Sequence, residues 1–185
     1  MHGKEVKIKR SRDAMDAGLG MITEDRRGNG IFGCLSIKDN TGISIYNKHL
    51  KAGFILDHPT INKIVDDSIK QLSIKTPSMQ QHIENLSGGN QQKVIVSRWL
   101  ANDPEILILD EPTRGIDVGA KHEIYEIMEQ LADQGKSIIM ISSEMPELLG
   151  MADRVYVMCN GKITGEIDQK EDMTQEKVMS FATQF

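Results

Sequence analysis

The stretch from residue 106 to residue 112, Ile-Leu-Ile-Leu-Asp-Glu-Pro, decides the fold of this chain. Its four apolar residues lie between Pro104 and Pro112, which predicts a short strand buried on both faces of a parallel sheet. The strand ends in two adjacent carboxylates, Asp110 and Glu111. Ligands of open α/β sheets bind outside the carboxyl ends of the strands, so both acids are candidates for a functional site.

The two carboxylates suit different tasks. Asp110 can hold Mg²⁺ through water, because this ion prefers oxygen ligands. Glu111 is placed to orient or deprotonate an attacking water molecule. The structural alternative for the same pattern is a buried strand that runs into an acidic turn.

Apolar runs and helical patterns alternate on the C-terminal side of this stretch. Strands that alternate with helices predict an α/β fold with a parallel sheet. Asn160-Gly161 is a strong hairpin turn between two of the strands. The predicted helices are 121–132, 146–151 and 174–181, and the predicted strands are 137–141 (also buried), 155–158 and 162–167.

On the N-terminal side, Leu86-Ser87-Gly88-Gly89-Asn90-Gln91-Gln92-Lys93 opens a helix predicted to run from Asn90 to Ala101. Two glycines allow a phosphate to approach the backbone closely, and a helix N-terminus presents free N–H groups and a positive dipole end. Ser87 adds a hydroxyl. A glycine turn that only caps the helix is the alternative. The acidic strand end that follows in the sequence favours a phosphate site.

Weaker patterns occupy the first part of the chain. Val6 and Ile8 alternate with lysines and predict a half-buried strand. The remaining predictions are a short helix over 11–16, a strand at 21–22, a loop over 24–33 and helical spacing between 43 and 73.

Composition excludes several classes of function. The net charge of −5 provides no basic field for nucleic acid, and aromatic residues at 4% argue against base stacking. The apolar runs are too short to span a bilayer, and no signal peptide is expected. Gly135-Lys136-Ser137 resembles the end of a phosphate-binding P-loop, but Gln130 stands where the first glycine belongs and a helix precedes it.

Leu86–Lys93, Ile106–Pro112 and Gly115-Ile116-Asp117 together resemble the ABC ATPase family. Leu86–Gly89 is similar to the family signature and Ile106–Asp110 to Walker B. Glu111 matches the catalytic carboxylate and Gly115–Asp117 the D-loop. The resemblance implies a partial P-loop NTPase core with a mainly parallel sheet and a helical signature subdomain. It also implies that the Walker A part is missing, since the chain starts after its expected place.

Further runs resemble the second cassette of double-cassette sugar-import ATPases of the galactose/methyl-galactoside and ribose type. These runs are 22–27 (Ile-Thr-Glu-Asp-Arg-Arg), 90–93, 112–120 and 142–147. The resemblance divides the chain into the end of the core β region with the Q-loop (1–30), the helical subdomain with the signature (31–101), and a last part (102–185). That last part carries Walker B, the D-loop, the switch region and a C-terminal hairpin and helix.

The resemblance also implies roles for individual residues. It makes Glu111 and Ser143 catalytic and Asp110 the ligand of Mg²⁺. Glu24 stands where most cassettes have the Q-loop glutamine, and Ser143 where they have the switch histidine. The residues expected to contact ATP are Ser87, Gly88, Gly89, Gln91, Asp117 and Glu24.

Two cassettes of this family pair head to tail, so the signature of one closes over ATP held by the other. The implied partners are the first nucleotide-binding domain of the same full-length chain, membrane permease subunits and, indirectly, a sugar-binding protein, without nucleic acid. The implied location is the cytoplasmic face of the bacterial inner membrane. The alternatives are a soluble ABC ATPase without transport and a nucleotide-sensing regulatory module.

Overall fold

The computed structural model describes residues 1–184. Contacts divide the chain into two compact units, Met1–Ile141 and the residues from Ser142 onward. The sequence-based division of the chain into 1–30, 31–101 and 102–185 follows motifs and not contacts, and it stays a prediction. Within the described residues no helix is both long and apolar enough to cross a membrane.

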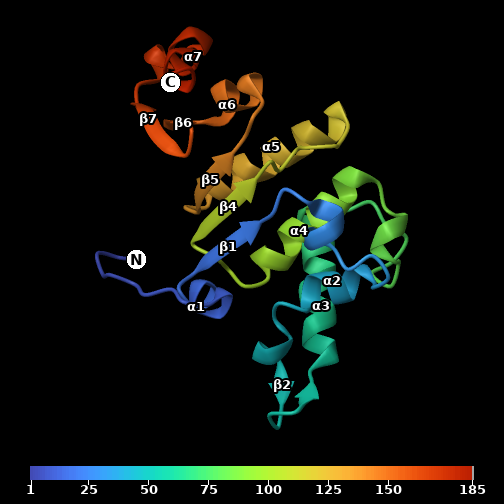
Figure 1. Ribbon diagram of the computed structural model, residues 1–185. Helices are drawn as coiled ribbons and strands as arrows, with labels where there is room; N and C mark the ends of the chain where they lie inside the picture. The colour runs from blue at the N-terminus through green and yellow to red at the C-terminus, as the bar shows by residue number, and fades with distance from the viewer. Residues whose placement is uncertain (185) are drawn as a thin grey trace. The chain divides into compact units, whose positions relative to one another are not determined.

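A three-stranded parallel sheet forms the centre of the first unit (Figure 1). Its strands β1 (Leu19–Ile22), β4 (Ile106–Asp110) and β5 (Ser137–Ile141) lie in the order β1-β4-β5. Leu109 pairs with Ile22 on one side and with Met140 on the other. The carboxyl ends of all three strands therefore meet at one edge, as the acidic end of residues 106–112 predicts.

The two faces of the sheet differ in burial. Leu107 and Leu109 are fully covered, and Trp99 from α4 (Gly88–Leu100) packs beside Gly20 on the same face. On the opposite face Ile139 is 52% exposed. Ile106 and Ile108 are half-buried and Ile141 is exposed, so the prediction that 106–112 and 137–141 are buried on both faces is wrong.

Helices and a small hairpin lie between β1 and β4 in the sequence. Figure 1 shows α2, α3 and α4 grouped beside β1, with β2 beyond the far end of α3. Thr41 and Ser97 share a buried hydrogen bond of 2.9 Å that joins α2 to α4. The elements are η1 (Arg26–Gly30, a π-helical turn), α2 (Ile37–Gly42), η2 (Tyr46–Lys48), β2 (Leu50–Lys51), β3 (Ile55–Leu56), α3 (His58–Gln71) and η3 (Ile83–Asn85).

Three predicted helices of the first unit are confirmed, and the strand predicted near the N-terminus is wrong. Helices α1 (Ser11–Asp16), α4 and α5 (Val118–Asp133) lie within a few residues of their predicted bounds. Val6 and Ile8 form no strand and are more than 40% exposed. Alternation without a neighbouring strand or a buried face is not enough to make a strand.

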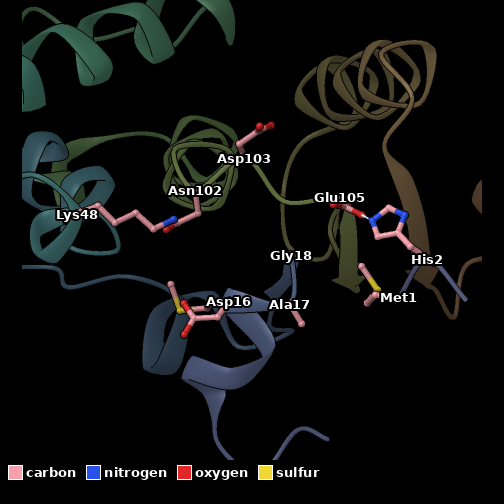
Figure 2. Close-up of a pocket in the computed structure, with 10 residues that line it drawn as sticks. Met1, His2, Asp16, Ala17, Gly18, Lys48, Asn102, Asp103 and Glu105 are labelled. Atoms are coloured by element: carbon pink, nitrogen blue, oxygen red, sulfur yellow. Dashed lines mark ion pairs between the residues drawn. The ribbon is translucent and has the colours of Figure 1, made fainter. Parts of the chain in front are cut away.

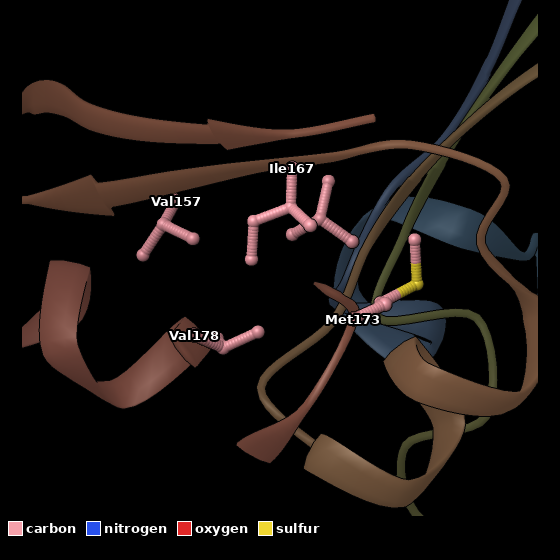
Figure 3. Close-up of a cluster of buried hydrophobic side chains, with 5 residues drawn as sticks. Val157, Ile167, Met173 and Val178 are labelled. Atoms are coloured by element: carbon pink, nitrogen blue, oxygen red, sulfur yellow. The ribbon is translucent and has the colours of Figure 1, made fainter. Parts of the chain in front are cut away.

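The second unit is small and has its own core. Its elements are α6 (Met145–Met151), β6 (Val155–Cys159), β7 (Lys162–Ile167), η4 (Lys170–Asp172) and α7 (Gln175–Ala182). The hairpin turn at Asn160-Gly161 is confirmed, and both residues have positive φ angles of 49° and 74°. Figure 3 shows the buried side chains between the hairpin and the helices, which are Val155, Val157, Ile167, Met173 and Val178.

Candidate functional site

The signature turn, Ser87–Gly89, lies at the start of α4. Ser87 is the N-cap, and its Oγ accepts a hydrogen bond of 2.9 Å from Asn90 Nδ2 and a longer one of 3.5 Å from the Asn90 backbone N–H. Ser87 is exposed, so its hydroxyl faces solvent at a helix N-terminus. A turn of this kind caps the helix and also offers N–H groups and a positive dipole end to an anion.

The two glycines of the turn are required for different reasons. Gly89 is buried, and a Cβ placed on it would lie only 2.4 Å from Cβ of Ala120 in α5. Gly88 is partly exposed and lies against Arg26 and Ile116, with hypothetical Cβ distances of 3.1 and 3.3 Å. Gly89 therefore permits close packing of α4 and α5, while Gly88 leaves room beside the turn for the Arg26 and Ile116 side chains.

The D-loop lies next to the signature turn because of this packing. Asp117 is the N-cap of α5, and its Oδ1 accepts a 2.9 Å hydrogen bond from the Ala120 N–H. Gly115 has a φ angle of +69°, which favours glycine and turns the chain into α5. The N-termini of α4 and α5 are thus brought together, and with them Ser87, Gly88, Gly89 and Asp117.

The carboxylates at the end of β4 adopt a backbone shape that the sequence does not reveal. Glu111 has a φ angle of +46°, which is uncommon for a residue with a side chain. Its N–H donates to Ile141 O at 2.9 Å, and its carbonyl accepts the Arg114 N–H at 3.1 Å. These bonds hold a strained turn directly after Asp110, and strain of this kind is often found at functional sites.

Glu24 lies near the same edge of the sheet, after β1, and forms an ion pair with Arg114. The sequence motifs assign no role of its own to Arg114. The four consecutive charged residues Glu24-Asp25-Arg26-Arg27 indicate that ion pairs form here, but they do not identify Arg114 as the partner of Glu24.

The Gln91 side chain is buried, with 5% exposure. Its Nε2 donates to Ile83 O at 3.2 Å and to Leu86 O at 3.1 Å, and its buried Oε1 has no partner. Gln91 therefore supports the chain that leads into the signature turn. A contact between Gln91 and ATP stays a prediction.

The donor set at this edge suits Mg²⁺ only in combination with a nucleotide. No group of three or more His, Cys, Asp or Glu residues within residues 1–184 could hold a metal ion alone. Protein-bound Mg²⁺ keeps several waters and is commonly held by one or two carboxylates and by substrate phosphates. A single Asp110 carboxylate at the carboxyl end of β4 fits that requirement.

Ser143 lies in the second unit and is exposed. The Oγ of the neighbouring Ser142 donates to the buried Glu147 and accepts the Glu144 N–H at 3.0 Å. These contacts shape the turn that presents Ser143, and the sequence alone did not indicate them.

A separate cavity lies at the opposite edge of the sheet. It has a volume of about 470 Å³ and contains the ion pair of 2.8 Å between His2 and Glu105 (Figure 2). Gly18 and Glu105 in its wall immediately precede β1 and β4. Ligands of open α/β sheets bind at the carboxyl ends of the strands, so this cavity is not the candidate site.

Two arginines were missed by sequence reasoning. Arg98 is buried and donates to Asn40 O at 2.6 Å, to Asn40 Oδ1 at 2.9 Å and to Gly30 O at 2.7 Å, and burial lowers its pKa to about 10. Arg26 lies between the signature turn and the D-loop. Arg26 belongs to the run 22–27, but that run does not reveal its contacts, and Arg98 lies in no motif, because both sets of contacts are with distant segments.

Comparison with known proteins agrees with this geometry. The ABC transporter family model matches residues 1–114. A galactose/methyl galactoside import ATP-binding protein of Clostridium tetani is 52% identical over 185 residues, which are 100% of this chain and 36% of that protein. A ribose import ATP-binding protein of Oceanobacillus iheyensis is 49% identical over 99% of this chain and 36% of that protein. The chain thus spans about a third of the length of these curated relatives.

Solved structures have the same fold. An ATP-binding cassette of an ABC transporter superposes with a TM-score of 0.74 at 20% identity, over 91% of this chain and 70% of that one. A Clostridium perfringens protein that is part of an ABC transporter complex has a TM-score of 0.74 at 23% identity, over 96% of this chain and 68% of that one. These matches confirm the α/β ATPase fold and its parallel sheet. The family match over residues 1–114, which contain the signature turn and the Walker B strand, shows that the chain belongs to the ABC transporter family.

Proposed function

We propose that this chain is the C-terminal part of the second nucleotide-binding domain in the ATP-binding subunit of a bacterial sugar importer. The observation that carries this proposal is 52% identity over the whole chain to a galactose/methyl galactoside import ATP-binding protein. Galactose, methyl galactoside and ribose are the candidate sugars, because the names of the similar relatives include all three. ATP hydrolysis coupled to sugar transport is the proposed activity of the full-length protein.

In this proposal the signature turn binds the γ-phosphate of ATP held by the first nucleotide-binding domain. Ser87 offers its hydroxyl, and the N-terminus of α4 offers free N–H groups and its dipole. Asp117 contacts the same nucleotide from the adjacent start of α5. The short distance between Gly89 and Ala120 supports this, because it brings the two helix N-termini to one surface.

The carboxylates act in the other site of the pair, which contains the chain's own Walker B residues. Asp110 would hold Mg²⁺, which would neutralise the phosphate charge when bound. Glu111 would orient or deprotonate the attacking water, and Ser143 would take the place of the switch histidine. Glu24 and Gln91 complete the set of proposed nucleotide contacts. A serine cannot supply the charge or proton handling of a histidine near neutral pH, so this site is expected to be the weaker one.

The proposed partners are the first nucleotide-binding domain of the full-length protein and membrane permease subunits, with a sugar-binding protein as an indirect partner. The proposed location is the cytoplasmic face of the bacterial inner membrane, where the subunit is peripheral. The net charge of −5 is consistent with a partner other than nucleic acid.

A chimaera tests this proposal. The chain replaces the corresponding segment of the Clostridium tetani relative, and uptake of labelled galactose, methyl galactoside and ribose is measured in cells that lack their own importers. We expect uptake of at least one of these sugars by the chimaera and none by a matched chimaera with Ser87→Arg. A correctly expressed chimaera that supports no uptake, or unchanged uptake by the Ser87→Arg chimaera, contradicts the proposal.

A further inference from the structure

Arg26 occupies a position between the two loops of the proposed nucleotide surface. It is the first residue of η1, and its Nη2 donates a hydrogen bond of 3.4 Å to the carbonyl of Gly115 in the D-loop. A Cβ on Gly88 would lie 3.1 Å from the same Nη2 and 3.4 Å from Cζ. The guanidinium therefore packs over the signature turn and reaches the D-loop at the same time.

The surroundings of Arg26 are poor for stabilising a cation. Its Nε is buried without a hydrogen-bond partner, and the ion pairs found within residues 1–184 do not include it. Burial, and then the charge of Arg27, lower the pKa of Arg26 below its ordinary value. A partly desolvated guanidinium with one long carbonyl contact adds little to stability. Its place at the two loops calls for another explanation.

A second contact joins the same segments. Glu24 forms an ion pair with Arg114, and their side chains are 48% and 64% exposed. An ion pair this exposed contributes little to stability, because water screens both charges. The loop after β1 therefore contacts the start of the D-loop at two points, Glu24 to Arg114 and Arg26 to Gly115. Both contacts restrict the position of the loop relative to the D-loop more than they stabilise the fold.

The other end of η1 is fixed to α4. Gly30 O accepts the 2.7 Å hydrogen bond from Arg98 Nη1, and a Cβ on Gly30 would lie 2.9 Å from Cδ1 of Ile95. Both Arg98 and Ile95 belong to α4, the helix that begins at the signature turn. Arg26 thus extends from a base that cannot shift without moving α4.

We propose that Arg26 is a positioning residue, which holds the signature turn and the D-loop at a fixed spacing so that both meet the same nucleotide. The inference rests on the proposed function, because the spacing matters only if this surface closes over ATP. Phosphate donors must be held within about 0.5 Å of their productive positions. The contacts of Arg26 with Gly88 and Gly115 restrain the two loops against each other, and the Glu24–Arg114 pair supports the D-loop side.

The test uses the assembled importer, with permease and full-length ATP-binding subunit, and measures steady-state ATP hydrolysis at several ATP concentrations. Arg26→Met keeps the length of the side chain and removes the charge and the donors, so we expect kcat to fall at least about tenfold while KM for ATP changes less than about threefold. Arg26→Lys keeps one donor and should recover part of the rate. Arg27→Met removes the exposed neighbouring arginine of the same turn and should behave as wild type.

Backbone hydrogen–deuterium exchange of the same proteins provides a second readout. Arg26→Met should increase exchange in segments 86–92 and 113–119 and leave exchange in α3 and β5 unchanged. Arg27→Met should leave exchange unchanged in all four of these regions. Wild-type kinetics and exchange for Arg26→Met would overturn the inference. Increased exchange throughout the first unit with a matching loss of thermal stability would also overturn it, since Arg26 would then be a general stabiliser.

Ser87→Arg separates this inference from the proposed function. If Ser87→Arg is inactive and Arg26→Met is fully active, the positioning role is wrong and the nucleotide site stands. If Ser87→Arg retains full activity, the proposed function fails and the positioning role fails with it.

Discussion

Replacing Gly89 by alanine tests why the signature turn requires a glycine at its second position. The added Cβ would lie 2.4 Å from Cβ of Ala120, whereas ordinary contacts begin at 3.4 Å. Neither methyl group can rotate away, so α4 and α5 must separate locally by about 1 Å. The change moves Ser87 and Gly88 with one helix and Asp117 with the other.

The expected cost follows from the overlap. Overpacking of this kind destabilises proteins by about 1–3 kcal/mol. In a chain of this size each kcal/mol lowers Tm by about 2–4 °C, so Gly89→Ala should lower Tm by about 2–12 °C. Ala120→Gly alone should cost up to about 1 kcal/mol through loss of helix propensity. The double variant should be close to Ala120→Gly alone, because it contains only one of the two methyl groups.

The assay is thermal and urea unfolding of all four proteins, followed by ATP hydrolysis in the assembled importer. A coupling free energy of about 1–3 kcal/mol between the two substitutions supports the packing argument. If Ala120→Gly does not rescue Gly89→Ala, the overlap does not explain the glycine. If the double variant recovers stability while its ATP hydrolysis stays low, Gly89 is also required because a phosphate must approach the backbone closely at this position.

Three further predictions address other parts of the molecule. The isolated 185-residue chain contains no Gly-x-x-x-x-Gly-Lys-Ser/Thr run, so it should not hydrolyse Mg-ATP, and micromolar ATP affinity in a titration would contradict this. The hydrogen bond from Lys93, at 2.9 Å, is the main cause that lowers the Glu123 pKa, so the ionised pair should stabilise the chain above pH 4.5 and lose that effect as pH falls through the lowered pKa. The stability difference between wild type and Glu123→Gln should therefore be larger at pH 7 than at pH 3. Gly165→Ala should destabilise the second unit, because its Cβ would lie 2.3 Å from the Phe181 ring, and a normal Tm would refute this contact.

Much of the fold was predictable because its strands and helices have strong local signals. The apolar runs that correspond to β4 and β5, the cap at Ser87 and the turn at Asn160-Gly161 specify their own conformation. Burial was predicted less well. Ile139 is apolar in a strong strand pattern and still half exposed, since burial depends on which helices cover the sheet and not on the strand itself.

The candidate site was predictable in its residue types but not in its geometry. The motifs identified Ser87, Asp110, Glu111 and Asp117. Ser87 lies at a helix N-terminus and Asp110 at a strand end as expected, whereas Asp117 is the N-cap of a helix that was predicted to begin only at residue 121. The contact of Arg26 with Gly88 and Gly115 joins segments that are distant in the sequence, so no local pattern could indicate it. The positive φ of Glu111 is likewise imposed by Ile141 and Arg114.

The central claim is that the signature turn of this chain serves the working ATP site, whereas its own Walker B carboxylates serve the weaker one. Steady-state ATP hydrolysis by Ser87→Arg and Glu111→Gln in one preparation of the assembled importer tests this most directly. Glutamine keeps the size of the Glu111 side chain and removes the base, so packing should change little. We predict that Ser87→Arg abolishes hydrolysis and that Glu111→Gln lowers it by a smaller factor. Equal loss of activity in the two variants would contradict the claim, because the two sites would then be equivalent or fully coupled.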